Sequence, residues 1–174
     1  MNKAVFLDRD GVINHTIFRM GKPRAPYTLN EFQLFDGVIE AIALLKLHQF
    51  LLIVVTNQPD VARGWVSRES VERMNYEVQE LLGVNCIKVC FHTEHDFCNC
   101  RKPQPGMLLE AASELSIDMK ESYMVGDRIT DIDAGISAGC RTVLIDESEN
   151  FEHPRPHFQT NSLLKAAEWI VKQF

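Results

Sequence analysis

The sequence predicts an α/β fold in which a doubly wound, Rossmann-like parallel sheet carries helices on both faces. Short apolar runs rich in β-branched residues alternate with segments whose apolar residues recur at helical spacing. Polar residues cluster directly after several of these runs, at the strand ends where such sheets carry their chemistry. The chain has 174 residues, 45% of them hydrophobic and 24% charged, which is typical of one globular domain. We therefore expect a single domain over residues 1–174.

The first part of the chain predicts a strand, a helix and a second strand. Residues 3–7 form a short apolar run that ends in Asp8-Arg9-Asp10-Gly11. Residues 37–48 place apolar side chains at helical spacing, and residues 50–55 form an apolar strand that ends in Thr56-Asn57-Gln58-Pro59. Strand, helix and strand in this order is typical of a parallel crossover.

The same alternation continues to the end of the chain. Each further helix is expected to begin at a residue suited to a helix start. These starts are Ser67 (helix to residue 82), Pro105 (to 115), Thr130 with Asp133 (to 138) and Asn161. Further strands are expected over residues 86–91, 122–125 and 141–145.

Four intervals show no regular pattern and are expected to be loops: residues 14–35, 59–66, 92–104 and 147–160. Three of them follow predicted strands. Because the carboxyl ends of parallel strands share one edge of the sheet, these loops should converge around Asp8, Thr56 and Asp127.

Charge and composition exclude several classes of protein. The net charge of -6 argues against a nonspecific nucleic-acid binder, which needs a basic surface. The longest apolar run, residues 50–55, is far too short to span a bilayer, and Asp8 interrupts any signal-like segment. Five cysteines without a secretory signal do not predict a disulfide framework. We therefore expect a cytoplasmic protein without a membrane span.

Two carboxylates follow the first predicted strand. Asp8 can supply a nucleophile, and Asp10, two residues later and on the same side of an extended backbone, can supply an acid or base. Taken alone, the run is equally compatible with an Asp-rich turn that has Gly11 at its corner.

Polar residues at three other places favour a functional site. Thr56 and Asn57 end the second strand, Lys102 precedes the helix that Pro105 opens, and Gly126-Asp127-Arg128 follows a later strand. Together with Asp8 they would provide a nucleophile, hydrogen-bond donors, a fixed cation and a further carboxylate for a divalent metal.

A second metal site is predicted by a cluster of cysteines. Cys90, His92, Cys98 and Cys100 offer three thiolates and an imidazole, the ligand set of a closed tetrahedral zinc site. His95 could replace His92, and a group of reduced loop cysteines is the alternative. Because four protein ligands leave no place for water, this zinc would be structural. Cys86 and Cys140 are expected to pack as small apolar residues.

The residues at the strand ends resemble the four motifs of the haloacid dehalogenase (HAD) superfamily of aspartate-nucleophile phosphatases. Asp-x-Asp-Gly, Thr, Lys, and Gly-Asp followed by a further acidic residue occur in this order between Asp8 and Asp131. The resemblance implies that Asp8 attacks phosphorus to form an aspartyl-phosphate. Asp10 would protonate the leaving alkoxide and then activate water.

The same resemblance implies the other roles. Thr56, Asn57 and Lys102 would hold the phosphoryl oxygens, and Mg²⁺ would lie on Asp8, the backbone carbonyl of Asp10, and Asp127. Asp131 either helps to hold the metal's water or Lys102, or stabilises the start of its helix. The implied substrate-binding residues are Asn57, Gln58, Arg101, Lys102 and Arg128. This set suits phosphoryl transfer, which needs positioning and neutralisation of negative charge.

The cysteine-rich loop narrows the resemblance to two nearly capless families. Cys-x-His…Cys-x-Cys-Arg-Lys-Pro resembles the D-glycero-D-manno-heptose 1,7-bisphosphate 7-phosphatases and the histidinol-phosphate phosphatases. Residues 8–14, 35–38 and 100–107 favour the heptose family. The implied reaction removes the 7-phosphate of the heptose bisphosphate during synthesis of surface-polysaccharide precursors. We expect a monomer that acts on a small phosphorylated sugar, with no nucleic-acid or membrane partner.

Three other functions stay open at this point. Histidinol-phosphate hydrolysis would use the same apparatus with an acidic pocket for the substrate ammonium, and Glu94, His95 and Asp96 leave this possible. A zinc-containing nucleic-acid module is disfavoured by the acidic balance. A phosphate-sensing protein with an inactive site is disfavoured because Asp8, Asp10, Lys102 and Asp127 are all present.

Two segments depart from the pattern of the heptose family. Pro59-Asp60 stand where that family usually has Ser-Gly, in a loop that would face the substrate. Residues 15–26 are longer and more basic than expected, with Arg19, Lys22 and Arg24. This segment is either a solvated surface loop or a source of cations for a distal phosphate.

Overall fold

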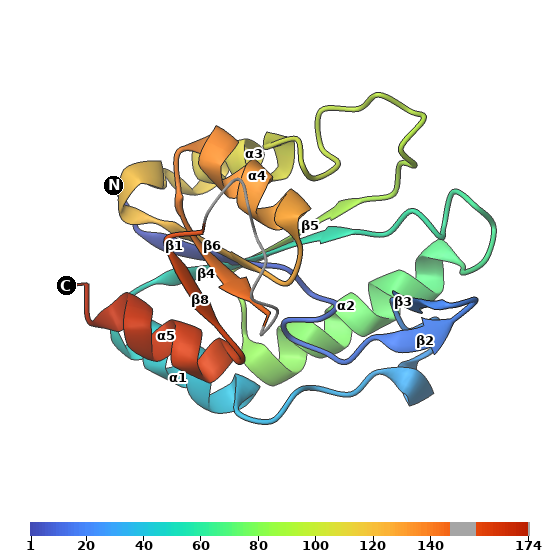
Figure 1. Cartoon of the computed structure of the whole chain (residues 1–174), viewed down its shortest axis with the longest axis horizontal. Coiled ribbons are helices and arrows are strands. Elements are labelled where there is room, and N and C mark those ends of the chain that lie inside the picture. The colour runs from blue at the N-terminus through green and yellow to red at the C-terminus, as the bar shows by residue number, and fades with distance from the viewer. Residues whose placement is uncertain (147–155, 174) are drawn as a thin grey trace.

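A computed structural model of the chain describes residues 1–146 and 156–173, and its central feature is a six-stranded parallel sheet. The strand order is β5-β4-β1-β6-β7-β8 (Figure 1). These strands are β1 (Ala4–Leu7), β4 (Leu51–Asn57), β5 (Cys86–Cys90), β6 (Tyr123–Gly126), β7 (Arg141–Ile145) and β8 (Phe158–Thr160). The helices are α1 (Val38–Leu47), α2 (Arg68–Leu82), α3 (Gly106–Leu115), α4 (Ile129–Ala138) and α5 (Leu163–Val171).

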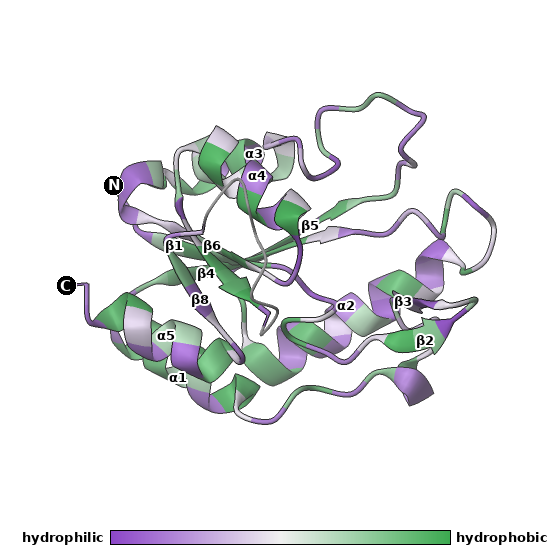
Figure 2. Ribbon diagram, in the orientation of Figure 1, coloured by the Kyte–Doolittle hydropathy of each residue, from purple (hydrophilic) through white to green (hydrophobic). Residues whose placement is uncertain are grey.

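Helices cover both faces of the sheet, so the predicted architecture is confirmed. Helices α1, α2 and α5 lie on one face, and α3 and α4 on the other (Figure 1). Alternate side chains of β1 enter the two layers: Val5 and Leu7 join the first, while Ala4 and Phe6 join the second. The central strands are accordingly hydrophobic on both sides (Figure 2). Among the described residues, no helix is long and apolar enough to cross a membrane.

The position of β1 explains where the polar residues gather. It lies between β4 and β6, so the chain builds the sheet outward in both directions from β1. Leu7 is in register with Val54 of β4 and with Val125 of β6. All three strands run parallel, and their carboxyl ends therefore meet at the topological switch point of the sheet, the usual ligand-binding place in such folds.

The structure corrects the prediction of loops over residues 14–35 and 147–160. The first interval contains an antiparallel hairpin, β2 (Ile17–Arg19) and β3 (Lys22–Arg24), and the short 3-10 helix Leu29–Glu31. Met20 and Gly21, the two residues of the hairpin turn, both have positive φ, which matches the twist of the strands. Residues 147–155 of the second interval lie outside the described part of the chain, and its last three residues form β8. Strands of three residues are too short to show a periodic pattern.

Two helix starts also differ from the expected ones. The hydroxyl of Ser162, not Asn161, caps α5 by accepting a hydrogen bond from the backbone N–H of Lys165. At α4, the cap is Arg128 instead of Thr130, and the Asp131 carboxylate accepts from the Arg128 backbone N–H at 3.1 Å. A carboxylate in the first helical turn can serve in place of a hydroxyl at the cap because both accept from exposed N–H groups.

Candidate active site

A cavity of about 630 Å³ opens at the carboxyl edge of the sheet. The predicted loops converge on it: its wall includes residues that follow β1, β4 and β6, residues of β3, and Arg101 and Lys102 from the cysteine-rich loop. Segments separated by more than a hundred residues in the chain therefore share one site.

Lys102 is the fixed cation of this cavity. Its side chain is only 3% exposed, and Nζ lies 2.6 Å from Asp8 Oδ1 and 2.6 Å from Asp131 Oδ1. The ammonium also donates to the carbonyl of Val55 at 2.7 Å. Burial alone would lower the pKa of Lys102, but the carboxylates of Asp131 and Asp8 outweigh burial and raise it above its usual value. The Lys102 ammonium is therefore expected to stay charged, and its three protons face three acceptors: Asp8, Asp131 and the carbonyl of Val55.

Asp8 lies in a group of three carboxylates. Side-chain oxygens of Asp8, Asp127 and Asp131 are all within 4.8 Å of one another. Burial raises the pKa of Asp8 to about 8; Lys102 opposes the rise, while Asp131 and Asp127 add to it. Burial, followed by Asp131, raises the pKa of Asp127 to about 6. Like charges held this close in a dry site require a compensating cation.

The arrangement around Asp127 fits a divalent metal. Asp127 Oδ1 is buried without a hydrogen-bond partner in the described part of the chain. Gly11 has a φ of +100°, and a Cβ atom there would lie 2.1 Å from Asp127 Oδ2, so the turn after β1 leaves room for that carboxylate only because residue 11 is glycine. Carboxylate oxygens of this kind are the ligands that Mg²⁺ prefers.

The Asp10 carboxylate does not belong to the group of Asp8, Asp127 and Asp131. Three other side chains donate hydrogen bonds to it. Arg9 Nη2 lies 3.1 Å from both Asp10 oxygens. Asn14 Nδ2 donates to Oδ1 at 2.9 Å, and Gln58 Nε2 donates to Oδ2 at 2.6 Å. Arg9 is 0% exposed and donates in turn to Asn75 Oδ1 on α2 at 2.7 Å. The plane of the Asp10 carboxyl group is therefore fixed from several elements.

The polar residues that end β4 make contacts within the protein. The Asn57 side chain joins both backbone groups of Lys102, donating to its carbonyl at 3.0 Å and accepting from its N–H at 3.1 Å. Gln58 donates to Thr56 Oγ1 at 2.8 Å as well as to Asp10. Asn57 and Gln58 also line the cavity. Asn57, the last residue of β4, thus holds the cysteine-rich loop against this strand at Lys102.

The two predicted substrate-binding arginines line the same cavity from opposite loops. Arg101 Nη1 donates to the carbonyl of His92 at 3.4 Å, and Nη2 lies 4.0 Å from Glu94. Arg128 is half exposed, with Nε 3.9 Å from Asp127 Oδ2. Both guanidinium groups keep donor capacity that these long contacts use only in part.

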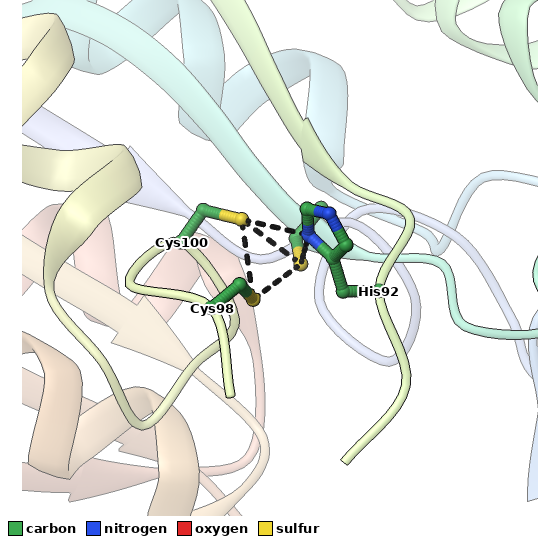
Figure 3. A group of neighbouring side chains, drawn as sticks. His92, Cys98 and Cys100 are labelled. Atoms are coloured by element: carbon green, nitrogen blue, oxygen red, sulfur yellow. Dashed lines mark hydrogen bonds between the residues drawn. The ribbon is translucent and has the colours of Figure 1, made fainter. Parts of the chain in front are cut away.

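The cysteine-rich loop gathers the four predicted metal ligands (Figure 3). Cys100 Sγ lies 3.3 Å from Cys90 Sγ, 3.4 Å from Cys98 Sγ and 3.2 Å from His92 Nδ1. A tetrahedral zinc with Zn–S bonds of ~2.3 Å sets sulfur atoms about 3.8 Å apart, so the cluster is close to that geometry. The His95 side chain is 87% exposed and lies outside the cluster. His92, not His95, thus lies with the three thiols as the fourth potential ligand.

The thiols of this cluster differ in their acidity before any metal binds. Burial raises the pKa of Cys90 to about 12. Burial also acts to raise the pKa of Cys98, but hydrogen bonds from the backbone of Arg101 and from Cys100 outweigh it and lower the pKa to about 7. Cys98 is therefore the most acidic thiol of the cluster.

Comparisons with known proteins agree with this geometry. A family model described as HAD-hydrolase-like matches residues 99–166. The D-glycero-beta-D-manno-heptose-1,7-bisphosphate 7-phosphatase of Pasteurella multocida (strain Pm70) is 40% identical over 83% of this chain and 82% of that protein. The enzyme of the same name from Escherichia coli (strain K12) is 38% identical over 97% of this chain and 87% of its own length. The chain belongs to this family of HAD phosphatases.

The solved structure of a relative has the same fold as this chain. The crystal structure of D,D-heptose 1,7-bisphosphate phosphatase from B. bronchiseptica, complexed with magnesium and phosphate, has a TM-score of 0.86 at 27% identity and covers 99% of both chains. A Campylobacter jejuni relative, 35% identical over 86% of both chains, is named for the alpha anomer of the sugar. These relatives are heptose enzymes, and the histidinol-phosphate alternative is not favoured.

Sequence reasoning missed two residues of the candidate site. Arg9 and Asn75 were not expected to contribute, although both hold Asp10 in place. A charged residue between two aspartates was the available signal for Arg9. Asn75 gave none, because it lies within an amphipathic helix far along the chain. Asp131 has both of the roles considered for it: Oδ1 pairs with Lys102, and Oδ2 accepts from the start of α4.

Proposed function

We propose that this phosphatase hydrolyses the 7-phosphate of D-glycero-D-manno-heptose 1,7-bisphosphate through an aspartyl-phosphate on Asp8. The observation that carries the proposal is the juxtaposition of Asp8, Lys102 and Asp127 at the switch point of the sheet. The names of the relatives support the substrate. The reaction would serve synthesis of surface-polysaccharide precursors, in a cytoplasmic monomer that folds as one domain with a minimal cap.

In the first step, an Asp8 carboxylate oxygen attacks phosphorus in line with the bond to the sugar oxygen. A new P–O bond to Asp8 forms, the bond to the 7-oxygen breaks, and Asp10 gives its proton to the leaving alkoxide. Lys102 offsets negative charge on the phosphoryl oxygens, and Thr56 and Asn57 orient the group. Because Lys102 is held by two carboxylates and a carbonyl, this positive charge is in place before substrate binds.

In the second step, water attacks the phosphorus of the aspartyl-phosphate. Asp10, now ionised, takes a proton from the water; the bond from phosphorus to Asp8 breaks, which frees phosphate and regenerates the Asp8 carboxylate. The contacts from Arg9, Asn14 and Gln58 support the assignment of Asp10 to both steps. A carboxyl group already fixed in its plane loses little freedom when the reaction begins.

Two metals would complete the enzyme. Asp8, the backbone carbonyl of Asp10 and Asp127 would hold Mg²⁺, which when bound lets an anionic nucleophile approach an anionic phosphate. The unpaired buried oxygen of Asp127 supports this ligand set, as does the magnesium in the B. bronchiseptica complex. Cys90, His92, Cys98 and Cys100 would hold a structural Zn²⁺ that fixes the loop carrying Lys102.

Substrate contacts would come from residues that line the cavity: Asn57, Gln58, Arg101, Lys102 and Arg128. The arginines suit hydroxyl and phosphate oxygens because a guanidinium offers several donors in one plane.

The test is phosphate release from a panel of substrates, with Mg²⁺ and with EDTA. The panel holds both anomers of the heptose bisphosphate, histidinol phosphate and fructose 1,6-bisphosphate. We expect the heptose bisphosphate to be hydrolysed most efficiently, by at least about 10-fold in kcat/KM, with the activity lost in EDTA and regained with Mg²⁺. A preference for histidinol phosphate would overturn the proposed substrate, and full activity in EDTA would overturn the magnesium site.

A further inference from the structure

The backbone of Lys102 lies in a turn whose own hydrogen bond does not involve it. The N–H of Gln104 donates to the carbonyl of Arg101 at 2.8 Å, which closes a turn with Lys102 at its second position. Lys102 is only 3% exposed, and the turn bond uses neither its backbone N–H nor its carbonyl. Buried backbone groups of this kind need a partner from elsewhere in the chain.

The side chain of Asn57 supplies both partners. Its Nδ2 donates to the Lys102 carbonyl at 3.0 Å, and its Oδ1 accepts from the Lys102 N–H at 3.1 Å. A carboxamide offers a donor and an acceptor side by side in one plane, as a neighbouring strand would, whereas a carboxylate offers acceptors alone. The residue type at position 57 therefore matches the two groups that it meets.

The same strand holds the other end of Lys102. Nζ donates to the carbonyl of Val55 at 2.7 Å and lies 2.6 Å from Asp8 Oδ1. Val55 and Asn57 are two residues apart on β4, so one short piece of strand fixes both the backbone and the ammonium of Lys102. Because β4 lies directly beside β1, the strand that Asp8 follows, the position of the cation relative to the proposed nucleophile is fixed from β4.

These contacts use most of the hydrogen-bonding capacity of the Asn57 side chain. One of its two amide hydrogens is donated to the Lys102 carbonyl, and its oxygen already accepts from the Lys102 N–H. Asn57 lines the cavity, so a substrate could meet the remaining hydrogen. The side chain can thus influence the reaction in two ways, through Lys102 or by direct contact with a substrate, and the two bonds in the structure belong to the first.

We propose that Asn57 is a positioning residue for Lys102, and that its side chain acts on the transferred phosphoryl group through this lysine. The proposal rests on the proposed function, because it takes Lys102 as the cation that offsets charge on the phosphoryl oxygens. If the Lys102 backbone is released, the ammonium keeps its charge but is no longer held at one place relative to Asp8. A charge stabilises a transition state most when it is already fixed where the opposite charge develops.

The experiment is a double-mutant cycle of Asn57→Ala and Lys102→Met, with heptose 1,7-bisphosphate and p-nitrophenyl phosphate as substrates in saturating Mg²⁺. We expect Asn57→Ala to lower kcat/KM by about 10- to 100-fold, as displacement of a catalytic group by ~1 Å does. The losses on the two substrates should agree within about 2-fold, because both carry the phosphoryl group on which Lys102 acts. In Lys102→Met, which lacks the ammonium, the same substitution should change kcat/KM by less than about 2-fold.

Inorganic phosphate gives a second readout that does not depend on turnover. Asn57→Ala should weaken phosphate binding in Mg²⁺, measured by calorimetry, and should have no further effect in Lys102→Met. Asn85→Ala is the matched control. Asn85 Oδ1 accepts from the N–H of Leu52 at 2.8 Å, near the opposite end of β4 and outside the cavity. Its loss should lower the melting temperature and change neither the kinetics nor phosphate binding.

Three results would overturn the positioning role. Losses for Asn57→Ala that are equally large with and without the Lys102 ammonium would show that Asn57 acts on the substrate itself. A loss confined to the heptose bisphosphate would assign Asn57 to the sugar. Kinetics and phosphate binding like those of Asn85→Ala, with only the melting temperature lowered, would show that the contact is merely structural.

Failure of the proposed function gives different results. An unaltered enzyme that does not prefer the heptose bisphosphate would refute the substrate, while the cycle on p-nitrophenyl phosphate, which has no sugar, would still test Asn57. Hydrolysis of p-nitrophenyl phosphate by Lys102→Met at the unaltered rate would refute the role of Lys102 and the positioning role together. A strongly impaired Lys102→Met protein beside an Asn57→Ala protein with unaltered kinetics would overturn the positioning role alone.

Discussion

Arg9 and Asp10 are neighbours in the chain, yet their side chains form an ion pair inside the protein, with Arg9 Nη2 3.1 Å from both oxygens of Asp10. The pair is completed by Asn75 of α2, which accepts from Arg9 Nη1 at 2.7 Å. A buried guanidinium without partners would be strongly destabilising. The Asp10 carboxylate, the proposed acid and base, is therefore oriented through Arg9 by a residue of α2 and not by its own loop alone.

The first prediction concerns this orientation. Arg9→Lys keeps the charge but removes the planar fork that contacts both Asp10 oxygens. We expect kcat to fall about 10- to 100-fold with little change in KM, because the acid–base group is misplaced while the substrate contacts stay. Arg73→Lys, the same substitution at an exposed position of α2, should have no effect. Unaltered kcat in a folded Arg9→Lys protein would show that the pair does not position Asp10.

The second prediction concerns the nucleophile. Asp8→Asn preserves the shape of the side chain but removes the attacking carboxylate, so kcat should fall by about 10³-fold or more. The variant should stay folded, because Lys102 keeps its contacts with Asp131 and the carbonyl of Val55. The measurement is phosphate release together with circular dichroism. Asp133→Asn, on α4 and outside the cavity, is the matched control; turnover by Asp8→Asn at the control's rate would refute the mechanism.

The third prediction is a dependence of stability on pH in the metal-free protein. Burial raises the pKa of Asp8 from 3.8 to about 8; Lys102 opposes this, and Asp131 and Asp127 add to it. Between these values the folded chain binds the proton and the unfolded chain does not, so the free energy of unfolding falls as pH rises from about 4 to about 8.

Asp8→Asn removes this titration. The melting temperature of the variant minus that of the unaltered protein should therefore increase as pH rises through the same window, measured by calorimetry in EDTA. Because Mg²⁺ favours the ionised carboxylates, adding it should reduce the difference near neutral pH. A difference that stays constant or shrinks with rising pH in EDTA would contradict the assigned shift.

The fourth prediction separates the two metals. Cys98→Ala should lower zinc content and the melting temperature together, by about 10 °C, since loss of a structural metal costs several kcal/mol and each kcal/mol is worth ~3 °C in a chain of this size. Cys86→Ala, at a half-buried cysteine of β5 outside the cluster, should leave zinc content unchanged. The structural zinc would be disproved by a Cys98→Ala protein with the zinc content and melting temperature of the unaltered chain.

The sequence predicts the parts of this fold whose signals are local. Residues 3–7 and 50–55 are apolar runs that end in polar residues, so both the strands and the meeting of Asp8 with Lys102 and Asp127 can be expected in advance. The cysteine spacing likewise predicts that Cys90, Cys98 and Cys100 lie together, because the end of β5 and the loop that follows it hold all three within eleven residues.

Features that depend on contacts between distant segments cannot be predicted in this way. The hairpin of β2 and β3 has strands of three residues and a Met-Gly turn, which is a weaker signal than Asn-Gly. The pair of Arg9 with Asn75 and that of Arg24 with Asp60 each join residues more than thirty positions apart. Only the packed structure brings such partners together, and the basic hairpin then acquires a defined place on the cavity wall.

Detection of the phosphorylated enzyme would test the aspartyl-phosphate mechanism most directly. Asp10→Asn is mixed with heptose 1,7-bisphosphate and Mg²⁺, quenched in acid within milliseconds, digested and analysed by mass spectrometry, because removal of the base should slow hydrolysis of the intermediate. We expect the peptide that contains Asp8 to gain the mass of one phosphoryl group, and the same peptide of the double variant Asp8→Asn, Asp10→Asn to gain none. Phosphorylation at any other residue, or hydrolysis at the unaltered rate with an unmodified peptide, would contradict the mechanism.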